Sequence, residues 1–378
     1  MSARQTGSSI KRVDLPSGPR WRFRLDLAAG ADGKRRQRTL SFKSEAEAVA
    51  AQSKGRVEVR NQTYVDPSRV TVSEYLDTWL AGRAKLRPTT RVNYRGHIAH
   101  MKQHLGSKRV QQVTRADVAS FVSALTREGL TPSTVRTIFV VLRKAMRDAI
   151  PELRQTDPTL KVELPEMIER ERPTWSPEQV RAFLAQVDDD PLVGCWHLTM
   201  RGLRRGEVVG LRWSDVDLAN GVVRIRHTRV RAGTEVVDGP PKTQRGKRDI
   251  PIDGELGNAL KLTRERTVSR AQVVPLRQRG EAGSNRLVAV DALGEALRPE
   301  AYGDAFARHA KAAGLPPIRL HDARHTVLTE MLLAGVAVHV VARFAGHDPA
   351  VTLRTYAHAA DDATRAAADT IGRLFAAR

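Results

Sequence analysis

Four short stretches in the C-terminal half of the chain combine side chains that could act on a phosphate. Residues 202–207 contain two arginines and a glutamate, and residues 241–248 contain two lysines and two arginines. Residues 320–325 read Leu-His-Asp-Ala-Arg-His, and residues 346–358 run from a Gly-His pair to a Tyr-Ala-His triplet. Each stretch is weak evidence by itself, because a lone tyrosine is usually a packed ring and a turn lysine is usually solvated.

Together, the four stretches contain what phosphodiester transfer requires without a metal ion. Arginine offers a planar fork for two phosphate oxygens, and fixed cations stabilise the charge that these oxygens gain in the transition state. The leaving sugar oxygen needs an acid, and histidine can move a proton near neutral pH. Tyrosine becomes a nucleophile once its proton is removed or its anion is stabilised.

The order and context of these groups resemble the tyrosine recombinase family, in its phage-integrase branch. The resemblance runs over essentially the whole chain and is strongest around the four stretches. It implies that Arg204 and Arg324 clamp the scissile phosphate and that Glu207 is the carboxylate that supports the site. It also implies that Lys242 is the general acid toward the leaving 5′ oxygen and that His321 is an assisting base.

Two further roles and the reaction itself are implied by the resemblance. His347 takes the position, His or Trp in the family, that bonds the scissile phosphate, and Tyr356 is the nucleophile. Attack leaves a 3′ phosphotyrosine and a free 5′ hydroxyl, and the 5′ hydroxyl of the partner strand then reverses the step on a new strand. The bond energy is kept in the phosphotyrosine, so we expect no ATP, metal or other cofactor.

The chain has 378 residues and a large basic excess, with 63 Lys and Arg against 42 Asp and Glu and a net charge of +21. The excess is uneven, because residues 1–66 hold 14 basic and 7 acidic side chains and residues 67–150 hold 15 and 5. The length suggests two or three domains. The charge favours a polyanionic partner, so we expect two basic binding modules ahead of a more balanced domain.

Several classes of protein and site are disfavoured by the sequence. Cys195 is the only cysteine, which excludes an intrachain disulfide and a cysteine-based zinc site. The N-terminus lacks the apolar core of a signal peptide. The most apolar stretch, residues 331–344, is interrupted by His339 and Arg343, which makes a membrane span costly. We therefore expect a soluble cytoplasmic protein without a metal site.

Residues 1–66 are predicted to form a small arm-type DNA-binding domain. Apolar and charged residues alternate over residues 21–27, which predicts a strand, and Asp-Gly at residues 32–33 predicts a hairpin turn into a second strand. Ser44 and Glu47 fit a capping box at a helix start. A small sheet with one helix and a basic outer face is therefore expected, although a merely solvated charged face would look the same.

Residues 67–155 are predicted to form a helical core-binding, SAM-like domain of four helices. Thr71 and Glu74 fit another capping box, and apolar residues recur at helical spacing between Thr114 and Gly129. The candidate DNA contacts are Arg22, Arg24, Arg36 and Arg38 in the arm-type domain and Arg87, Arg91 and Arg95 in the helical domain.

Residues 170–378 are predicted to form the mixed α/β catalytic domain. Ser176 and Pro177 open a helix, and residues 222–252 alternate in a way that predicts a strand and then a hairpin with Lys242 at its tip. The expected fold class is mainly α with small β-sheets (α+β), in the three-domain tyrosine-recombinase architecture.

The resemblance implies a site-specific DNA recombinase, an integrase that integrates or excises a phage or mobile element. Its expected partners are double-stranded attachment sites, three further copies in a homotetramer, and an accessory DNA-bending or excision factor. The tail, residues 361–378, could dock on a neighbouring subunit or pack on its own.

Two alternatives remain open. One is a chromosome-dimer resolvase or a type IB topoisomerase of the same chemistry, and the arm-like domain argues against the resolvase. The other is a non-enzymatic DNA-binding regulator. The complete catalytic set argues against this regulator, because binding alone needs only phosphate contacts.

Overall fold

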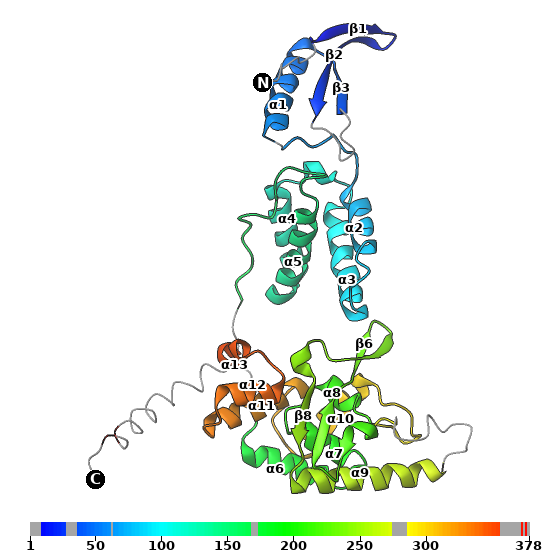
Figure 1. Cartoon of the computed structure of the whole chain (residues 1–378), viewed down its shortest axis with the longest axis vertical. Coiled ribbons are helices and arrows are strands. Elements are labelled where there is room, and N and C mark those ends of the chain that lie inside the picture. The colour runs from blue at the N-terminus through cyan, green and yellow to red at the C-terminus, as the bar shows by residue number, and fades with distance from the viewer. Residues whose placement is uncertain are drawn as a thin grey trace. The chain divides into compact units, whose positions relative to one another are not determined.

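The computed structural model divides the chain into two compact units, residues 1–168 and residues 169–378 (Figure 1). The residues that the structure describes are 9–27, 36–61, 63–167, 173–273 and 286–355, together with Gly372 and Phe375. Each unit is described by itself below.

The N-terminal part of the first unit is a three-stranded antiparallel sheet covered by one helix. The elements are β1 (Lys11–Leu15), β2 (Gly18–Leu27), β3 (Arg36–Phe42) and α1 (Glu45–Arg60). Phe23 and Leu25 are buried with Ala48 of the helix, which confirms the predicted apolar face of the strand. Ser44 caps the helix as predicted, by accepting a hydrogen bond from the backbone of Glu47. The first strand had not been predicted, and residues 32–33 lie outside the described residues.

The rest of the first unit is a helical bundle. Its elements are α2 (Val72–Ala81), α3 (Pro88–Leu105), a 3-10 turn at Val110–Gln112, α4 (Arg115–Arg127) and α5 (Pro132–Asp148). Capping boxes begin α2 at Thr71 and α4 at Thr114, because a threonine oxygen accepts from the third helical residue, whose carboxylate accepts in return. The apolar faces of the four helices share one core, as their spacing predicted.

The second unit combines helices with two small sheets. Its helices are α6 (Pro177–Gln186), α7 (Val193–Thr199), α8 (Arg205–Val209), α9 (Gly254–Val273), α10 (Pro299–Ala312), α11 (Leu320–Leu333), α12 (Val338–Ala345) and α13 (Pro349–Thr355). Its strands are β4 (Val216–Asp217), β5 (Val222–Ile225), β6 (Thr228–Ala232), β7 (Glu235–Gly239) and β8 (Arg248–Pro251). Short 3-10 turns lie at Trp213–Asp215 and Gln244–Gly246. An aromatic group centred on Trp175, Phe183 and Trp196 fills the core.

The strands of the second unit pair differently from the predicted order. β5 pairs with β8, with Val223 opposite Ile250, while β6 and β7 form a separate two-stranded hairpin. Lys242 therefore lies in the link between β7 and β8, and its predicted place at a hairpin tip is wrong. Alternation along the sequence shows which residues form strands, but it does not show which strands pair.

The described residues form a mainly helical protein with three small antiparallel sheets, which confirms the predicted α+β fold class. None of the described helices is both long enough and apolar enough to cross a membrane. The division between the two compact units falls after residue 168 of the sequence. A boundary near residue 66 inside the first unit stays a prediction.

Candidate active site

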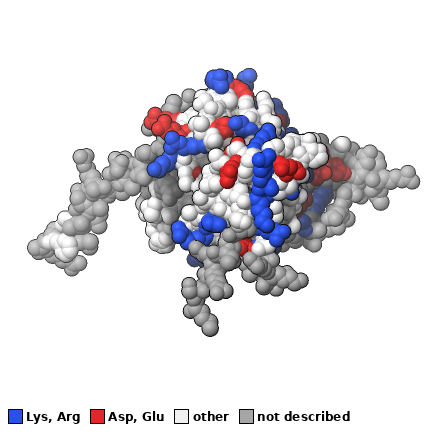
Figure 2. All heavy atoms as spheres, turned by 90° about the horizontal axis from the view of Figure 1, so that it is seen from above, with Lys and Arg blue, Asp and Glu red and all other residues white. Residues whose placement is uncertain are grey.

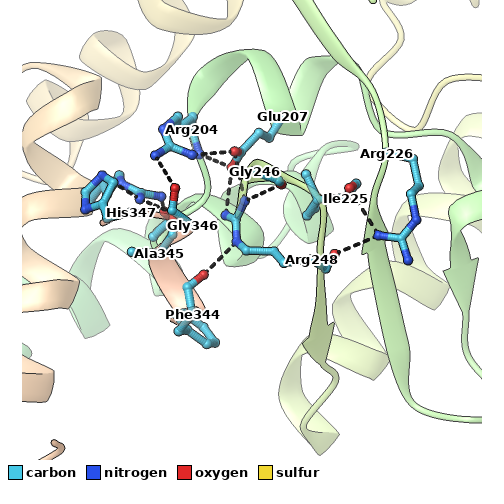
Figure 3. Close-up of polar contacts among 12 residues, drawn as sticks. Arg204, Glu207, Ile225, Arg226, Gly246, Arg248, Phe344, Ala345, Gly346 and His347 are labelled. Atoms are coloured by element: carbon cyan, nitrogen blue, oxygen red, sulfur yellow. Dashed lines mark hydrogen bonds and ion pairs between the residues drawn. The ribbon is translucent and has the colours of Figure 1, made fainter. Parts of the chain in front are cut away.

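Arg204 and Glu207 form the first part of a polar cluster in the second unit (Figure 3). Arg204 precedes the short helix α8, and Glu207 is its third residue. The backbone N–H of Arg204 donates to Oε2 of Glu207 at 2.9 Å, and Nη1 of Arg204 donates to Oε1 at 2.8 Å. Nη2 of Arg204 also donates to the carbonyl of Gly346 at 3.2 Å. The predicted pairing of this arginine with a carboxylate three residues later is present.

Glu207 is 1% exposed and binds a second arginine, Arg248 of β8. Nη1 and Nη2 of Arg248 lie 2.9 Å from Oε1 and Oε2 of Glu207, respectively. Burial alone would raise the pKa of Glu207, but the hydrogen bonds and charge of Arg248, together with the charge of Arg204, lower it to about 2. Glu207 is therefore an anion at any pH at which the protein works.

Arg324 supplies the second candidate phosphate-binding guanidinium. It lies in the first turns of α11 and is 1% exposed. Its guanidinium donates to the carbonyls of Gly202 and Ala345, and its Nη2 lies 3.0 Å from Nε2 of His347. Arg324 therefore joins the turn before α8, the end of α12 and the histidine.

His347 follows a left-handed glycine that ends α12. Gly346 has φ +64°, and a Cβ added there would lie 2.9 Å from the carbonyl oxygen of Arg245, so only glycine fits this turn. Burial lowers the pKa of His347 to about 4, and the charges of Arg324, Arg204 and Arg248 lower it in the same direction. The imidazole is therefore neutral at pH 7.

The hydrogen bonds of His347 indicate which ring nitrogen carries its proton. A guanidinium can only donate, so Nε2 of His347 must accept from Arg324, and the proton is assigned to Nδ1. Nδ1 is buried and has no hydrogen-bond partner among the described residues. A buried donor of this kind fits an anionic oxygen of a bound group.

The structure thus brings four of the predicted side chains together in one cluster. Arg204, Glu207, Arg324 and His347 are joined by the hydrogen bonds above. His321 is exposed on α11, and its ring contacts His325 with centroids 5.0 Å apart. Lys242 is exposed and forms no hydrogen bond or ion pair within the described part of the chain. Tyr356, the predicted nucleophile, lies outside the described residues, as does the tail from residue 361 except for Gly372 and Phe375.

Arg248 is the member of the cluster that sequence reasoning missed. A signal for it existed, since Arg248 and Ile250 alternate with exposed residues in a β-strand and therefore share one face. An arginine on the buried face of a strand needs an acidic partner. Only Glu207, far away in the sequence, supplies that partner here.

The candidate DNA contacts of the N-terminal sheet lie on two different faces. Arg24 is exposed and Arg22 half-buried, and both lie on the face opposite the apolar one. Arg36 and Arg38 pair in register with Leu27 and Leu25, so they lie on the face that α1 covers. Both approach Asp66, with Arg38 Nη1 at 3.1 Å from Oδ1.

The candidate contacts of the helical bundle also differ from one another. Arg87 and Arg95 are exposed at the start and on the surface of α3. Arg91 instead donates to the carbonyl of Arg83 at 2.7 Å and thereby fixes the loop between α2 and α3. On the face of the molecule seen in Figure 2, Lys and Arg side chains gather in several clusters with Asp and Glu between them.

A basic cavity of about 930 Å³ opens beside the polar cluster in the second unit. Its lining, between β8 and α12, includes Arg226, Arg245, Lys247, Arg248, Arg343 and His347. Of the cluster, Arg248 and His347 line this cavity. The guanidinium groups of Arg204 and Arg324, together with a neutral imidazole donor, can hold the non-bridging oxygens of a phosphodiester. No group of three or more His, Cys, Asp or Glu side chains that could hold a metal ion lies among the described residues.

Comparison with known proteins matches two separate parts of the chain. Residues 177–363 match the model of the phage integrase family, and residues 72–152 match the phage integrase N-terminal SAM-like domain. A XerC-like tyrosine recombinase of Caldanaerobacter subterraneus is 24% identical over 93% of this chain and 96% of its own length. An integrase of Mycobacterium phage L5 is 25% identical over 89% of this chain and 90% of its own.

Solved structures show the same fold. The Tn1549 transposon integrase, in complex with transposon right end DNA, superposes with a TM-score of 0.68 at 23% identity and covers 81% of this chain and 100% of that structure. The two family matches together span most of the second unit and of the helical bundle, and they contain all seven residues to which the resemblance gave roles. The chain belongs to the phage integrase family and is a tyrosine site-specific recombinase.

Proposed function

We propose that the cluster around Glu207 holds the scissile phosphate of a DNA attachment site while Tyr356 attacks it. The observation that supports this assignment most is the convergence of two guanidinium groups, from Arg204 and Arg324, with a buried and unpartnered N–H of His347. Three donors from three separate elements fit the non-bridging oxygens of one phosphodiester. Glu207 neutralises part of the positive charge and orients Arg204.

In the proposed reaction the phenol oxygen of Tyr356 forms a bond to the scissile phosphorus, and the bond from phosphorus to the 5′ oxygen breaks. The phenol proton passes to the imidazole of His321, and Lys242 gives a proton to the leaving 5′ oxygen. The product is a 3′ phosphotyrosine. A 5′ hydroxyl of the partner strand then attacks this phosphorus, releases the tyrosine and completes one strand exchange.

Lys242 and His321 must approach the phosphate for this reaction. Both are exposed in the DNA-free chain, and Lys242 lies on the link between β7 and β8. An exposed link can move onto bound DNA, since catalytic contacts often tighten only when the substrate is present.

The partner in this proposal is double-stranded DNA. The integrase of Tn1549 was solved with transposon DNA, and the basic excess of residues 1–150 suits a polyanion. We assign residues 1–66 to arm-site binding, residues 67–155 to core-site binding and residues 170–378 to catalysis. A homotetramer in the cytoplasm, aided by an accessory DNA-bending or excision factor, would then join two attachment sites.

Covalent trapping tests this function. The attachment site is first sought as a repeated sequence in the DNA that flanks the gene. A duplex of that site, nicked next to the scissile phosphate so that the leaving fragment diffuses away, is incubated with the protein and run on a denaturing gel. The wild type should form a covalent adduct and Tyr356→Phe should form none. Equal amounts of adduct from both proteins would show that Tyr356 is not the nucleophile. No adduct from the wild type on its own site would favour a DNA-binding regulator.

A further inference from the structure

Arg248 touches three different parts of the second unit with one guanidinium group (Figure 3). Its Nη1 and Nη2 bind the two oxygens of Glu207 on α8 at 2.9 Å each. Its Nε donates to the carbonyl of Phe344 on α12 at 2.6 Å. Its Nη1 also donates to the carbonyl of Gly246, in the turn before β8, at 3.1 Å.

The backbone of Arg248 is held as firmly as its side chain. Arg248 lies in β8 opposite Ile225 of β5, and its carbonyl accepts from Nη1 of Arg226 at 3.2 Å. The residue is 9% exposed. The guanidinium group is planar, and Nε, Nη1 and Nη2 each donate to a partner in a fixed direction. These contacts together hold the Arg248 side chain in one orientation.

Glu207 receives two arginines of unequal exposure. The side chain of Arg204 is 34% exposed, whereas that of Arg248 is 6% exposed. The two-point contact with Arg248 prevents the Glu207 carboxylate from rotating. Both carboxylate oxygens are therefore held in fixed positions for their hydrogen bonds from Arg204. The orientation of Arg204 therefore depends on Arg248.

The contact with α12 reaches the other end of the cluster. Phe344, whose carbonyl Arg248 binds, lies three residues before His347. A Cβ added to Gly346 would lie 3.1 Å from Nη1 of Arg248, so the turn that carries His347 packs directly on this guanidinium. Arg248 thereby joins the residues that hold Arg204 to the turn that holds His347.

We propose that Arg248 is a positioning residue for strand cleavage. It holds the Arg204 guanidinium and the turn of His347 at the positions from which they bind the phosphate, and does not itself bind the phosphate. This inference rests on the proposed function of the cluster. A purely structural ion pair would stabilise the fold and leave the rate of cleavage in the bound complex unchanged. A positioning residue changes that rate even when folding and DNA affinity are preserved.

The test replaces the guanidinium of Arg248 with an amine that carries the same charge. Arg248→Lys retains a cation for Glu207 but cannot bind both of its oxygens and the Phe344 carbonyl at once. Single-turnover cleavage of the nicked attachment site should fall by about 100-fold at saturating DNA, while DNA affinity stays within about threefold of the wild type. Arg224→Lys is the matched control, because Arg224 lies on the neighbouring strand and binds Asp217 at 2.9 Å, outside the cluster. It should cleave like the wild type.

Two further measurements separate positioning from other effects. In the double variant Glu207→Gln with Arg248→Lys, the loss should be no greater than that of the worse single variant, because both act through one contact. In a substrate with sulfur in place of the leaving 5′ oxygen, the leaving group needs no acid, so Lys242→Ala should cleave this substrate at close to the wild-type rate. Arg248→Lys should still cleave it slowly, since its defect lies in the position of the phosphate-binding groups.

Each result has a defined meaning. Cleavage by Arg248→Lys at the wild-type rate, full additivity with Glu207→Gln, or rescue by the sulfur substrate would overturn the inference. If Arg248→Lys melts more than about 5 °C below the wild type, the neutral pair Glu207→Gln with Arg248→Gln takes its place. Wild-type cleavage by that pair would equally overturn the inference. The Tyr356→Phe control reports on the proposed function separately, because it does not alter the Arg248 contacts.

Discussion

The exposed arginines of the first unit and the buried arginines around Glu207 in the second unit have opposite surroundings. In the first unit Arg24 and Arg95 are exposed side chains of a sheet and a helix surface. In the second unit Arg248 and Arg324 are buried, and their donors are bound to a carboxylate, backbone carbonyls and an imidazole. An exposed guanidinium attracts a polyanion from a distance without a fixed geometry. A buried guanidinium that is held by such bonds is already aligned when the anion arrives.

The difference predicts separable defects. Substitutions of the exposed arginines in the first unit should weaken DNA binding and leave cleavage in the bound complex intact, because the lost charges act only before and during binding. Substitutions in the second unit should slow cleavage or lower stability with a smaller effect on DNA binding. The four predictions below test this division, beginning with the largest effect.

The first prediction concerns Arg324. Arg324→Lys keeps the charge but removes the fork that bonds Gly202, Ala345 and His347 at once. Single-turnover cleavage at saturating DNA should fall by about 1,000-fold, as for the loss of a fixed transition-state donor. Adduct formation on a denaturing gel measures it. Wild-type cleavage at saturating DNA, combined with a lower DNA affinity, would mean that Arg324 serves binding only.

The second prediction concerns the stability of the cluster. Glu207→Gln leaves the buried Arg248 without its anionic partner, so unfolding of the second unit should become easier by about 3 kcal/mol. Urea denaturation measures it. Asp217→Asn is the matched control, because Asp217 also has a pKa of about 2 but pairs with Arg224 nearer the surface. An equal loss of unfolding free energy in both variants would show that burial of the carboxylate does not set the loss, since Asp217 is only half-buried.

The third prediction concerns acid. Burial and nearby arginines lower the pKa of His347 from 6.5 to about 4, so between these values the unfolded chain binds the extra proton. The free energy of unfolding should therefore fall as the pH drops from about 6.5 to 4. Because the pKa of Glu207 is lowered from 4.5 to about 2, the stabilisation by its carboxylate should be lost in turn as the pH drops between these two values. Between pH 7 and pH 5, calorimetry should show a fall in melting temperature that is smaller in His347→Gln by on the order of 3 °C. Equal falls in the two proteins would contradict a buried neutral imidazole.

The fourth prediction concerns the open face of the N-terminal sheet. Arg24→Ala should weaken binding to arm-type DNA and reduce the slope of log affinity against log salt by about 1. Arg38→Ala is the matched comparison on the same sheet, because Arg38 faces α1 and pairs with Asp66. Its salt slope should change less. If Arg38→Ala lowers the slope more than Arg24→Ala, DNA lies on the helix side of the sheet.

Local patterns in the sequence were enough to predict much of the fold. The capping residues Thr71, Thr114 and Ser176 mark helix starts where the structure has them, because a cap depends only on residues three positions apart. The alternation around Phe23 predicts which strand face is buried for the same reason. The family, and with it the candidate catalytic set, was also evident from four short stretches.

Only the tertiary structure decided how these elements meet. The pairing of β5 with β8, which moves Lys242 from a hairpin tip to a link, depends on contacts between distant segments. So does the role of Arg248, whose carboxylate partner lies 41 residues away in the sequence. The faces of Arg24 and Arg38 likewise follow from the strand register and the position of α1. A sequence determines local geometry through its neighbours, but long-range partners are chosen by packing, which no short window of residues contains.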